Sequence, residues 1–195
     1  MNIILDKRYF WALRAICYKL IFGKIGNMSY IGHPLFIVRA KRVFLGKRVR
    51  IFPHFRFEIL NDMGSINIQN NVSIGQNFHA ISDGELTIGE NTTISANVFI
   101  TNTEHTFNQV DVHIMDQPMK FSETQVGSNC FIGYGVTIQA GTILGKQCII
   151  GANAVVRGQF PDYCVIVGAP AKIVKRYNPE NQQWEKTNNK GDFLR

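Results

Sequence analysis

This chain of 195 residues has little charge, few acidic residues and no long apolar run. Its 14 Asp and Glu against 21 Lys and Arg leave a net charge of +7, which favours anionic partners such as phosphates or an acidic membrane face. Positive charge alone does not specify a nucleic acid, so we do not expect a nucleic-acid partner. No uncharged apolar stretch approaches the roughly 20 residues of a membrane span.

Paired cysteines and common catalytic signatures are also missing. The four cysteines form no C-x-x-C motif, which predicts a reducing cytoplasm rather than an oxidising compartment. Asp6, Lys7 and Arg8 interrupt the start of the chain, so we expect no secretory leader. There is no G-x-S-x-G elbow and no P-loop. His105 and His113 have no third ligand at an obvious spacing, so we expect no metal, with a metal-dependent enzyme as the alternative.

A six-residue period is the strongest positive signal in the sequence. From 126 to 156 every sixth residue is aliphatic: Val126, Ile132, Ile138, Leu144, Ile150 and Val156. Glycine follows four of these, and a small or β-branched residue, such as Cys130 or Cys148, stands four positions after each of the first five. A period of six matches neither a helix nor a single strand. It is typical of a parallel β-helix, in which every sixth residue points inward.

The predicted fold is therefore an all-β solenoid. Earlier segments repeat the pattern less strictly, as at Ile68–Ile74 and Ile88–Ile94–Ile100. With 18 residues per three-sided coil we expect about five coils. The glycines suit turns where a side chain would clash or where φ must be positive. We place the solenoid domain at 30–176, after an N-terminal helical segment at 1–29 and before a polar C-terminal extension at 177–195.

Residues 7–22 predict an amphipathic helix. Phe10, Leu13, Cys17 and Leu20 share one stripe, and Lys7, Arg14 and Lys19 add positive charge. One interpretation is an interfacial helix within residues 1–25 that touches anionic lipid or a lipid-linked substrate. The other is a helix packed on the base of the solenoid or on a neighbouring subunit. The sequence leaves both open.

Residues 101–125 break the six-residue period completely. Loops of this length are uncommon in compact domains and are usually functional. His105 stands where this excursion loop leaves the solenoid, among polar neighbours. A base at the edge of a rigid wall is well placed for proton transfer, so His105 is the candidate catalytic residue.

Four segments resemble the hexapeptide-repeat acyltransferases, and among them the sugar and polysaccharide O-acetyltransferases. They are NTEHTF (102–107), MDQP (115–118), the coils at 130–156, and PDYCVIVGAPAKIVKRY (161–177). This resemblance implies a left-handed parallel β-helix, a homotrimer, and acetyl-CoA as acyl donor. It implies that His105 removes the proton from a sugar hydroxyl, and that the backbone N–H of Tyr134 supports the oxyanion.

The resemblance also implies further site residues. The expected donor-binding residues are Phe131, Gly133, Ala152, Arg157, Lys172 and Lys175, and the expected substrate-binding residues are His79, Asn102 and Glu104. Phe131 stands where relatives often have Trp, and Arg157–Gly158 replaces a frequent Thr-Lys. The usual Asp-His ahead of the catalytic histidine is Asn102–Thr103 here, which leaves Glu104, Asp111 or Glu123 to orient His105.

The expected function is O-acetyl transfer from acetyl-CoA to a sugar hydroxyl of a surface polysaccharide or its precursor. We expect the protein in the cytoplasm, with the inner face of the membrane as a further location. An acyltransferase acting on an amine or an antibiotic is one alternative. A solenoid scaffold without catalysis is another. For Arg157, Lys172 and Lys175, ordinary solvated charge is the alternative to phosphate contact.

Overall fold

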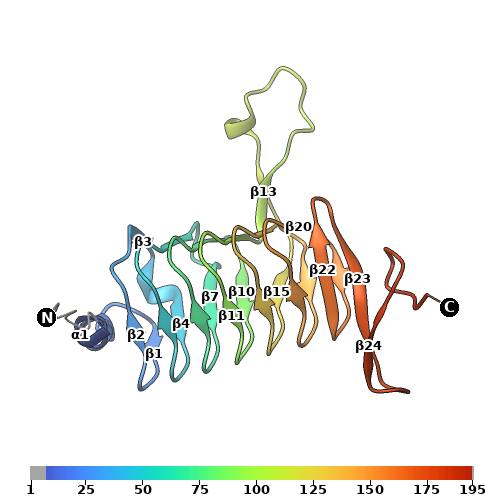
Figure 1. Ribbon diagram of the computed structural model, residues 1–195. Coiled ribbons are helices and arrows are strands. Elements are labelled where there is room, and N and C mark those ends of the chain that lie inside the picture. Colours follow the sequence, from blue (N-terminus) through green and yellow to red (C-terminus); the bar gives the residue numbers. More distant parts are fainter. Residues whose placement is uncertain (1–7, 195) are drawn as a thin grey trace, which may run out of the picture.

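Three parallel sheets form the sides of a triangular prism in the computed structural model, which describes residues 8–194 (Figure 1). Side A contains β1 (Lys24–Ile25), β4 (Val43–Leu45), β7 (Ser65–Ile68), β10 (Glu85–Ile88), β15 (Thr124–Val126), β18 (Ile143–Leu144) and β21 (Gln159–Phe160). Side B contains β2 (Tyr30–Ile31), β5 (Arg50–Ile51), β8 (Ser73–Ile74), β11 (Thr93–Ile94), β16 (Phe131–Ile132), β19 (Ile149–Ile150) and β22 (Cys164–Gly168). Side C contains β3 (Phe36–Val38), β6 (Arg56–Ile59), β9 (His79–Ser82), β12 (Phe99–Thr101), β17 (Thr137–Ile138) and β20 (Val155–Val156).

The chain winds through sides A, B and C in turn, as the left-handed parallel β-helix that the family resemblance implied. It completes six coils and begins a seventh, where about five were expected. The extra coil lies in the N-terminal part, where the period departs from 18. Ile25 pairs with Leu45, and Leu45 pairs with Ile68, because the sides of these coils carry longer strands and turns.

The inward-facing aliphatic residues form one continuous core. All six residues of the series at 126–156 are at most 1% exposed, which confirms the periodicity prediction. Each fully buried side chain of this size stabilises the fold by about 1.5–3 kcal/mol. Cys130, Cys148 and Cys164 are buried in three successive coils, as expected for core filling at the first two.

Glycine and asparagine have different roles in the turns between the sides. A Cβ added at Gly127 would overlap the carbonyl oxygen of Gly145 in the next coil, so this glycine permits close approach of the backbone. Asparagine is the residue type that most often adopts positive φ here, as at Asn71 and Asn91, whose side-chain amides hydrogen-bond across coils at 2.9 Å. The expected glycine role is thus mostly close packing rather than positive φ.

Both ends of the solenoid are covered. Helix α1 (Arg8–Tyr18) lies across the N-terminal end and contacts β2, with Ala15 in the core (Figure 1). At the other end β23 (Ala171–Asn178) folds back antiparallel on β22, and β24 (Gln183–Lys186) pairs with β23. Such caps protect the open ends of a repeat structure. None of the helices among residues 8–194 is long and apolar enough to cross a membrane.

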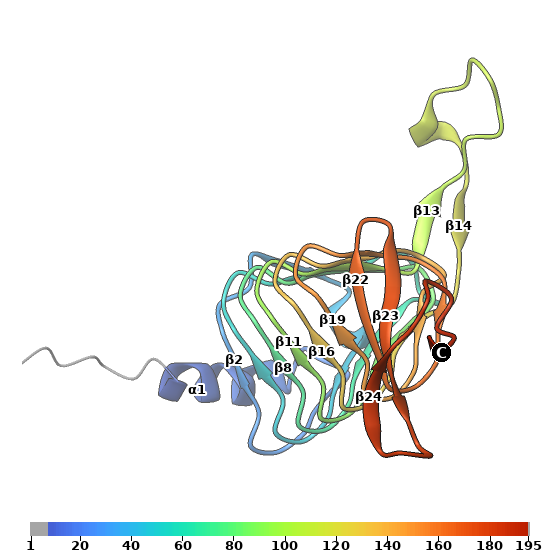
Figure 2. The same cartoon turned by 45° about the vertical axis from the view of Figure 1, so that its right-hand side comes forward.

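Residues 101–125 form an ordered arm rather than a structureless loop. Strands β13 (Thr103–His105) and β14 (Met119–Phe121) pair antiparallel and carry the chain away from the corner between sides C and A (Figure 2). At the tip, the buried amide of Gln117 donates to the carbonyls of Gln109 and Val112 and accepts from the N–H of Gln109. A short 3₁₀ turn, η2 (Ile114–Asp116), completes the tip.

Candidate active site at the base of the arm

His105 occupies the last position of β13, opposite Met119 in the arm. Its ring is partly buried, and its Nδ1 atom is fully buried without a hydrogen-bond partner among the described residues. An unpaired buried polar atom costs about 1–3 kcal/mol, so such atoms in native proteins need an explanation. A catalytic ring that finds its partner only in the assembled or substrate-bound site provides one.

The arm is fixed to the solenoid by Asn102. This residue is fully buried, and its side chain accepts from the N–H of Asp83 at 2.8 Å and donates to the carbonyl of Glu85 at 3.2 Å. The expectation that Asn102 binds substrate is therefore corrected. Its amide groups are consumed in holding β13 against the neighbouring coil, and no part of the side chain is accessible to a ligand.

Glu104 points toward the C-terminal coils and forms an ion pair with Arg157. The Nη2 atom of Arg157 donates to Oε1 of Glu104 at 2.9 Å. Arg157 follows β20 at the same corner of the prism, two coils beyond the origin of the arm. Glu104 is thus engaged with Arg157 rather than with His105. None of the three proposed carboxylates, Glu104, Asp111 or Glu123, hydrogen-bonds Nδ1 of His105 in the described part of the chain.

His79 lies on the outer face of side C, within a small polar cluster. Its Nε2 contacts Oε1 of Glu58 at 2.7 Å, and Nη2 of Arg56 donates to the same oxygen at 3.0 Å. The ring of Phe99 packs edge-on against His79, with 5.1 Å between centroids. Burial lowers the pKa of His79 and outweighs the hydrogen bond to Glu58, so the neutral imidazole is favoured.

The expected donor-binding residues lie in three places. Phe131 on β16 faces outward from side B, in register with Ile149 and Val165. Gly133 lies beside Ala152 where sides B and C meet, because a Cβ at Gly133 would lie 2.7 Å from the amide nitrogen of Ala152. Lys172 and Lys175 follow on β23, also on side B, whereas Arg157 belongs to the corner that carries the arm.

Tyr134 also lies between sides B and C, away from the corner that carries His105. Its hydroxyl accepts a hydrogen bond from Asn97, and its carbonyl accepts from the N–H of Asn153 at 2.8 Å. Within one chain, His105, Glu104 and Arg157 therefore lie at the same corner of the prism, whereas Tyr134 lies at a different corner from His105. The sequence pattern alone did not indicate this separation.

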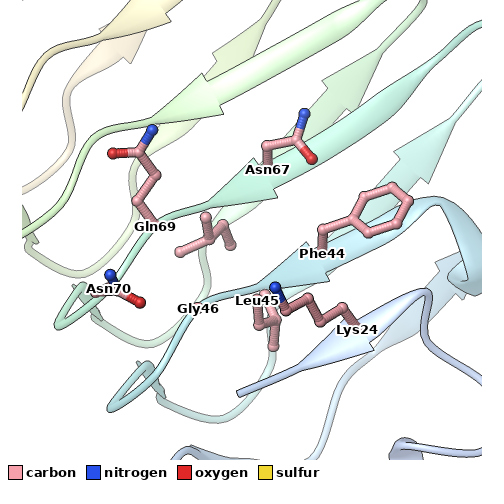
Figure 3. Close-up of a pocket in the computed structure, with 8 residues that line it drawn as sticks. Lys24, Phe44, Leu45, Gly46, Asn67, Gln69 and Asn70 are labelled. Carbon is pink, nitrogen blue, oxygen red and sulfur yellow. The ribbon is translucent and has the colours of Figure 1, made fainter.

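The surface of the described residues has several hollows. One, lined by Glu85, Thr87, Phe121 and Glu123 among others, adjoins the base of the arm. Another lies on side A near the N-terminal end, where Lys24, Phe44 and Asn67 surround a space of about 260 Å³ (Figure 3). A third lies beside Tyr163 and Tyr177 at the C-terminal end. None of the hollows includes His105, and no group of three or more His, Cys, Asp or Glu among residues 8–194 is arranged to hold a metal ion.

His113, the second histidine of the arm, has a local structural role. Its Nδ1 accepts from the N–H of Met115 at 3.2 Å at the start of η2. This bond was not anticipated from the sequence, although a histidine before a short turn is a plausible cap for it.

Comparisons with known proteins agree with the fold. Residues 123–158 match the family model "Bacterial transferase hexapeptide (six repeats)". The chain is 39% identical over 132 residues to the putative lipopolysaccharide biosynthesis O-acetyl transferase WbbJ of Escherichia coli K12, covering 63% of this chain and 66% of WbbJ. It is 29% identical over 121 residues to the galactoside O-acetyltransferase of the same organism, covering 59% of each.

Among solved structures, the fold matches that of AntD. A crystal structure of a variant of this N-acyltransferase from Bacillus cereus, in complex with dTDP-4-amino-4,6-dideoxyglucose and coenzyme A, superposes with a TM-score of 0.73 at 15% identity. The match covers 86% of this chain and 90% of AntD. The chain spans less than two thirds of the length of WbbJ and of the galactoside enzyme. The repeat, the stacked coils and these sequence relatives establish that the chain belongs to the hexapeptide-repeat acyltransferase family.

Proposed function

We propose that this protein transfers an acetyl group from acetyl-CoA to a hydroxyl of a sugar, with His105 as general base. The observation that carries the proposal is the placement of His105 at the base of an ordered arm with a buried, unpartnered Nδ1. His105 removes the hydroxyl proton while the hydroxyl oxygen attacks the thioester carbonyl. The carbon–sulfur bond then breaks, and His105 gives this proton to the departing thiolate of coenzyme A.

The site is formed between two copies of the chain. In one chain His105, Glu104 and Arg157 occupy the corner between sides C and A, whereas Phe131, Lys172 and Lys175 belong to side B. One donor molecule can meet both groups if the arm corner of one prism faces side B of another. Parallel prisms arranged around a threefold axis satisfy this requirement. Each of the three contacts then joins the arm corner of one copy to side B of the next.

The tip of the arm supports this assembly. Phe107, Val110 and Met115 are 77%, 85% and 66% exposed, although Gln117 holds the tip in a defined shape. An ordered apolar surface that stands clear of its own solenoid is typical of a subunit contact. A neighbouring copy would cover these side chains and at the same time supply the missing partner of His105.

Acetyl-CoA as donor is supported by the chemistry of side B. Phe131, Ile149 and Val165 present an apolar strip along successive coils, which suits the pantetheine portion of the donor. Lys172 and Lys175 stand at the C-terminal end of this strip, where they supply positive charge for phosphate groups. The N–H of Tyr134 remains the proposed donor to the oxyanion, contributed by the copy opposite His105.

The acceptor is proposed to be a sugar because WbbJ and the galactoside enzyme are both named for O-acetyl transfer. His79, held by Glu58, presents a neutral polar ring on side C and is the candidate contact to the acceptor. The likeness to AntD favours a second candidate, transfer to an amino sugar, because AntD is described as an N-acyltransferase. A catalytically silent scaffold is disfavoured by the retained arm and His105.

Steady-state turnover of acetyl-CoA against matched acceptors tests the proposal. The panel pairs hexoses with the corresponding amino sugars, each as free sugar, nucleotide sugar and lipid-linked oligosaccharide. We expect ester formation on a hydroxyl to exceed amide formation. Preference for the amine would establish the second candidate, and no turnover with any acceptor would favour the scaffold. Light scattering of the same sample is expected to give three times the mass of the 22.1 kDa chain.

A further inference from the structure

Helix α1 has two apolar faces that point in opposite directions. On the inner face Trp11 packs on Tyr30 and Phe52, with ring centroids 5.9 and 5.4 Å apart, and Arg14 donates to the carbonyl of Ile31 at 3.0 Å. Arg14, one of the cations that the membrane interpretation assigned to anionic lipid, is therefore bound to the solenoid instead. Packing on the solenoid base uses one face of the helix and leaves the other unexplained. Lys7, also assigned to anionic lipid, lies outside the described residues.

The outer face of α1 is apolar and strongly exposed. Its residues, together with Leu20 and Ile21 beyond the end of the helix, share high exposure and lack charge: Tyr9 80%, Phe10 57%, Leu13 59%, Ile16 62%, Leu20 86% and Ile21 45%. No exposed residue from Tyr9 to Tyr18 carries a charge. A helix covered by solvent on this side would normally present polar residues there. The stripe of Phe10, Leu13, Cys17 and Leu20 expected from the sequence lies within this face.

The same end of the prism carries most of the positive charge. Residues 9–57 contain ten Lys and Arg and no Asp or Glu, whereas residues 58–194 contain eight Lys and Arg and thirteen Asp and Glu. Five cations at this end are exposed, namely Lys19 just after α1 and, in the first two coils, Lys24, Lys41, Lys47 and Arg48. Lys24 lies on side A beside Phe44, as Figure 3 shows. The charge is therefore polarised along the solenoid axis, with its positive end at α1.

We propose that this end of the solenoid, formed by the outer face of α1 and the exposed cations of the first two coils, docks on an anionic phospholipid surface. Apolar side chains enter the interface between head groups and acyl chains, and the surrounding cations meet the phosphates. A second copy fits this surface poorly, because an end-to-end contact would bring two strongly positive ends together. In parallel prisms all the α1 helices would lie on one side and bind the same membrane together.

Flotation of the full-length protein with vesicles tests this inference without any assay of acetyl transfer. We expect binding to vesicles that contain phosphatidylglycerol, no binding to pure phosphatidylcholine, and loss of binding as salt rises. Absence of binding to the anionic vesicles at low salt overturns the proposal, whatever the catalytic activity of the protein. Binding to both vesicle types with equal strength overturns the proposal that the cations of this surface bind anionic head groups.

Two variants locate the docking surface. The double change Leu13→Glu with Ile16→Glu alters the outer face of α1, and Lys19→Glu with Lys47→Glu alters exposed cations without touching the helix packing. Each is expected to weaken vesicle binding at least about tenfold while the melting temperature and light-scattering mass stay unchanged. Matched controls at the opposite end, Leu194→Glu and Lys190→Glu, are expected to bind as the parent does.

The mass measurement separates lipid docking from a subunit contact. A drop in mass with the Leu13 and Ile16 changes assigns the face of α1 to another copy and overturns the proposal. If that variant fails to fold, the Lys19 and Lys47 changes decide alone. Full vesicle binding by the lysine variant then overturns the proposal, and reduced binding by a folded variant of unchanged mass supports it.

Discussion

Arg157 Nη2 donates to Glu104 Oε1 at 2.9 Å, which joins two residues 53 positions apart in the chain. Glu104 lies on the arm next to His105, and Arg157 lies on the corner of a later coil. The pair therefore links the arm to the solenoid at β13, the strand that carries His105. Since the Arg157 side chain is 56% exposed, we expect the pair to contribute at most about 1 kcal/mol to stability.

We predict that this ion pair positions the arm, so Arg157→Gln and Glu104→Gln should each lower kcat severalfold and leave the KM for acetyl-CoA nearly unchanged. The double variant should be no worse than the worse single variant, because both remove one interaction. Kinetics of the four proteins test this. If Arg157→Gln alone raises the donor KM, Arg157 contacts phosphate as first expected from the sequence.

Substitution of His105 should remove the general base without removing the fold. We expect His105→Ala to lower turnover by about 10²–10⁴-fold, the usual effect of losing such a base. The melting curve should not fall, because Nδ1 of His105 makes no hydrogen bond to the described residues that could be lost. His113→Ala serves as the control and should retain near-normal turnover. A His105→Ala enzyme of normal rate would refute the mechanism.

Lys172 and Lys175 should act on the donor alone. Replacing both by Gln is expected to raise the KM for acetyl-CoA and to make that KM less sensitive to salt, because fewer charge contacts remain to be screened. The acceptor KM should not change. Lys146→Gln, on a turn between sides A and B, is the matched control. Equal effects of all three lysines would mean that only the overall charge of the protein matters.

The cysteines should divide into one reactive and three protected thiols. Cys17 is exposed on α1, whereas Cys130, Cys148 and Cys164 are buried in successive coils. The hydrogen bond with Cys130, the hydrogen bond with Cys164, and burial all raise the pKa of Cys148. Titration with a thiol reagent at neutral pH is expected to label Cys17 only, and denaturant should expose the other three. Rapid labelling of a second thiol in the native protein would contradict this division into one reactive and three protected thiols.

His79 should make stability depend on pH in a defined direction. Because burial lowers its pKa below 6.5 in the folded state, the unfolded chain binds more protons as the medium becomes acidic. The contribution of this residue to stability is therefore complete above pH 6.5 and is lost as the pH falls toward the lowered folded-state pKa. Denaturant melts at pH 7.5 and 5.5 should differ less for His79→Asn than for the parent. An equal difference would show that other groups cause the loss.

The sequence by itself determined the solenoid. Inward residues at every sixth position, from Val126 to Val156, can be buried together only if short strands and tight turns repeat. It also singled out His105 as the candidate base, because the loss of the period at 101–125 is visible without any structure. Local spacing carries this information, since each coil packs mainly on its immediate neighbours.

Tertiary structure alone decided what the side chains near His105 do. The sequence could not show that Asn102 is consumed by the backbone of Asp83 and Glu85, or that Glu104 turns to Arg157, because these contacts join different coils. The sequence also did not give the number of coils, because the first coils are longer than 18 residues and obscure the repeat there. The separation of Phe131 and Tyr134 from His105 arises because the prism has three sides, and residues near in sequence order can face different directions.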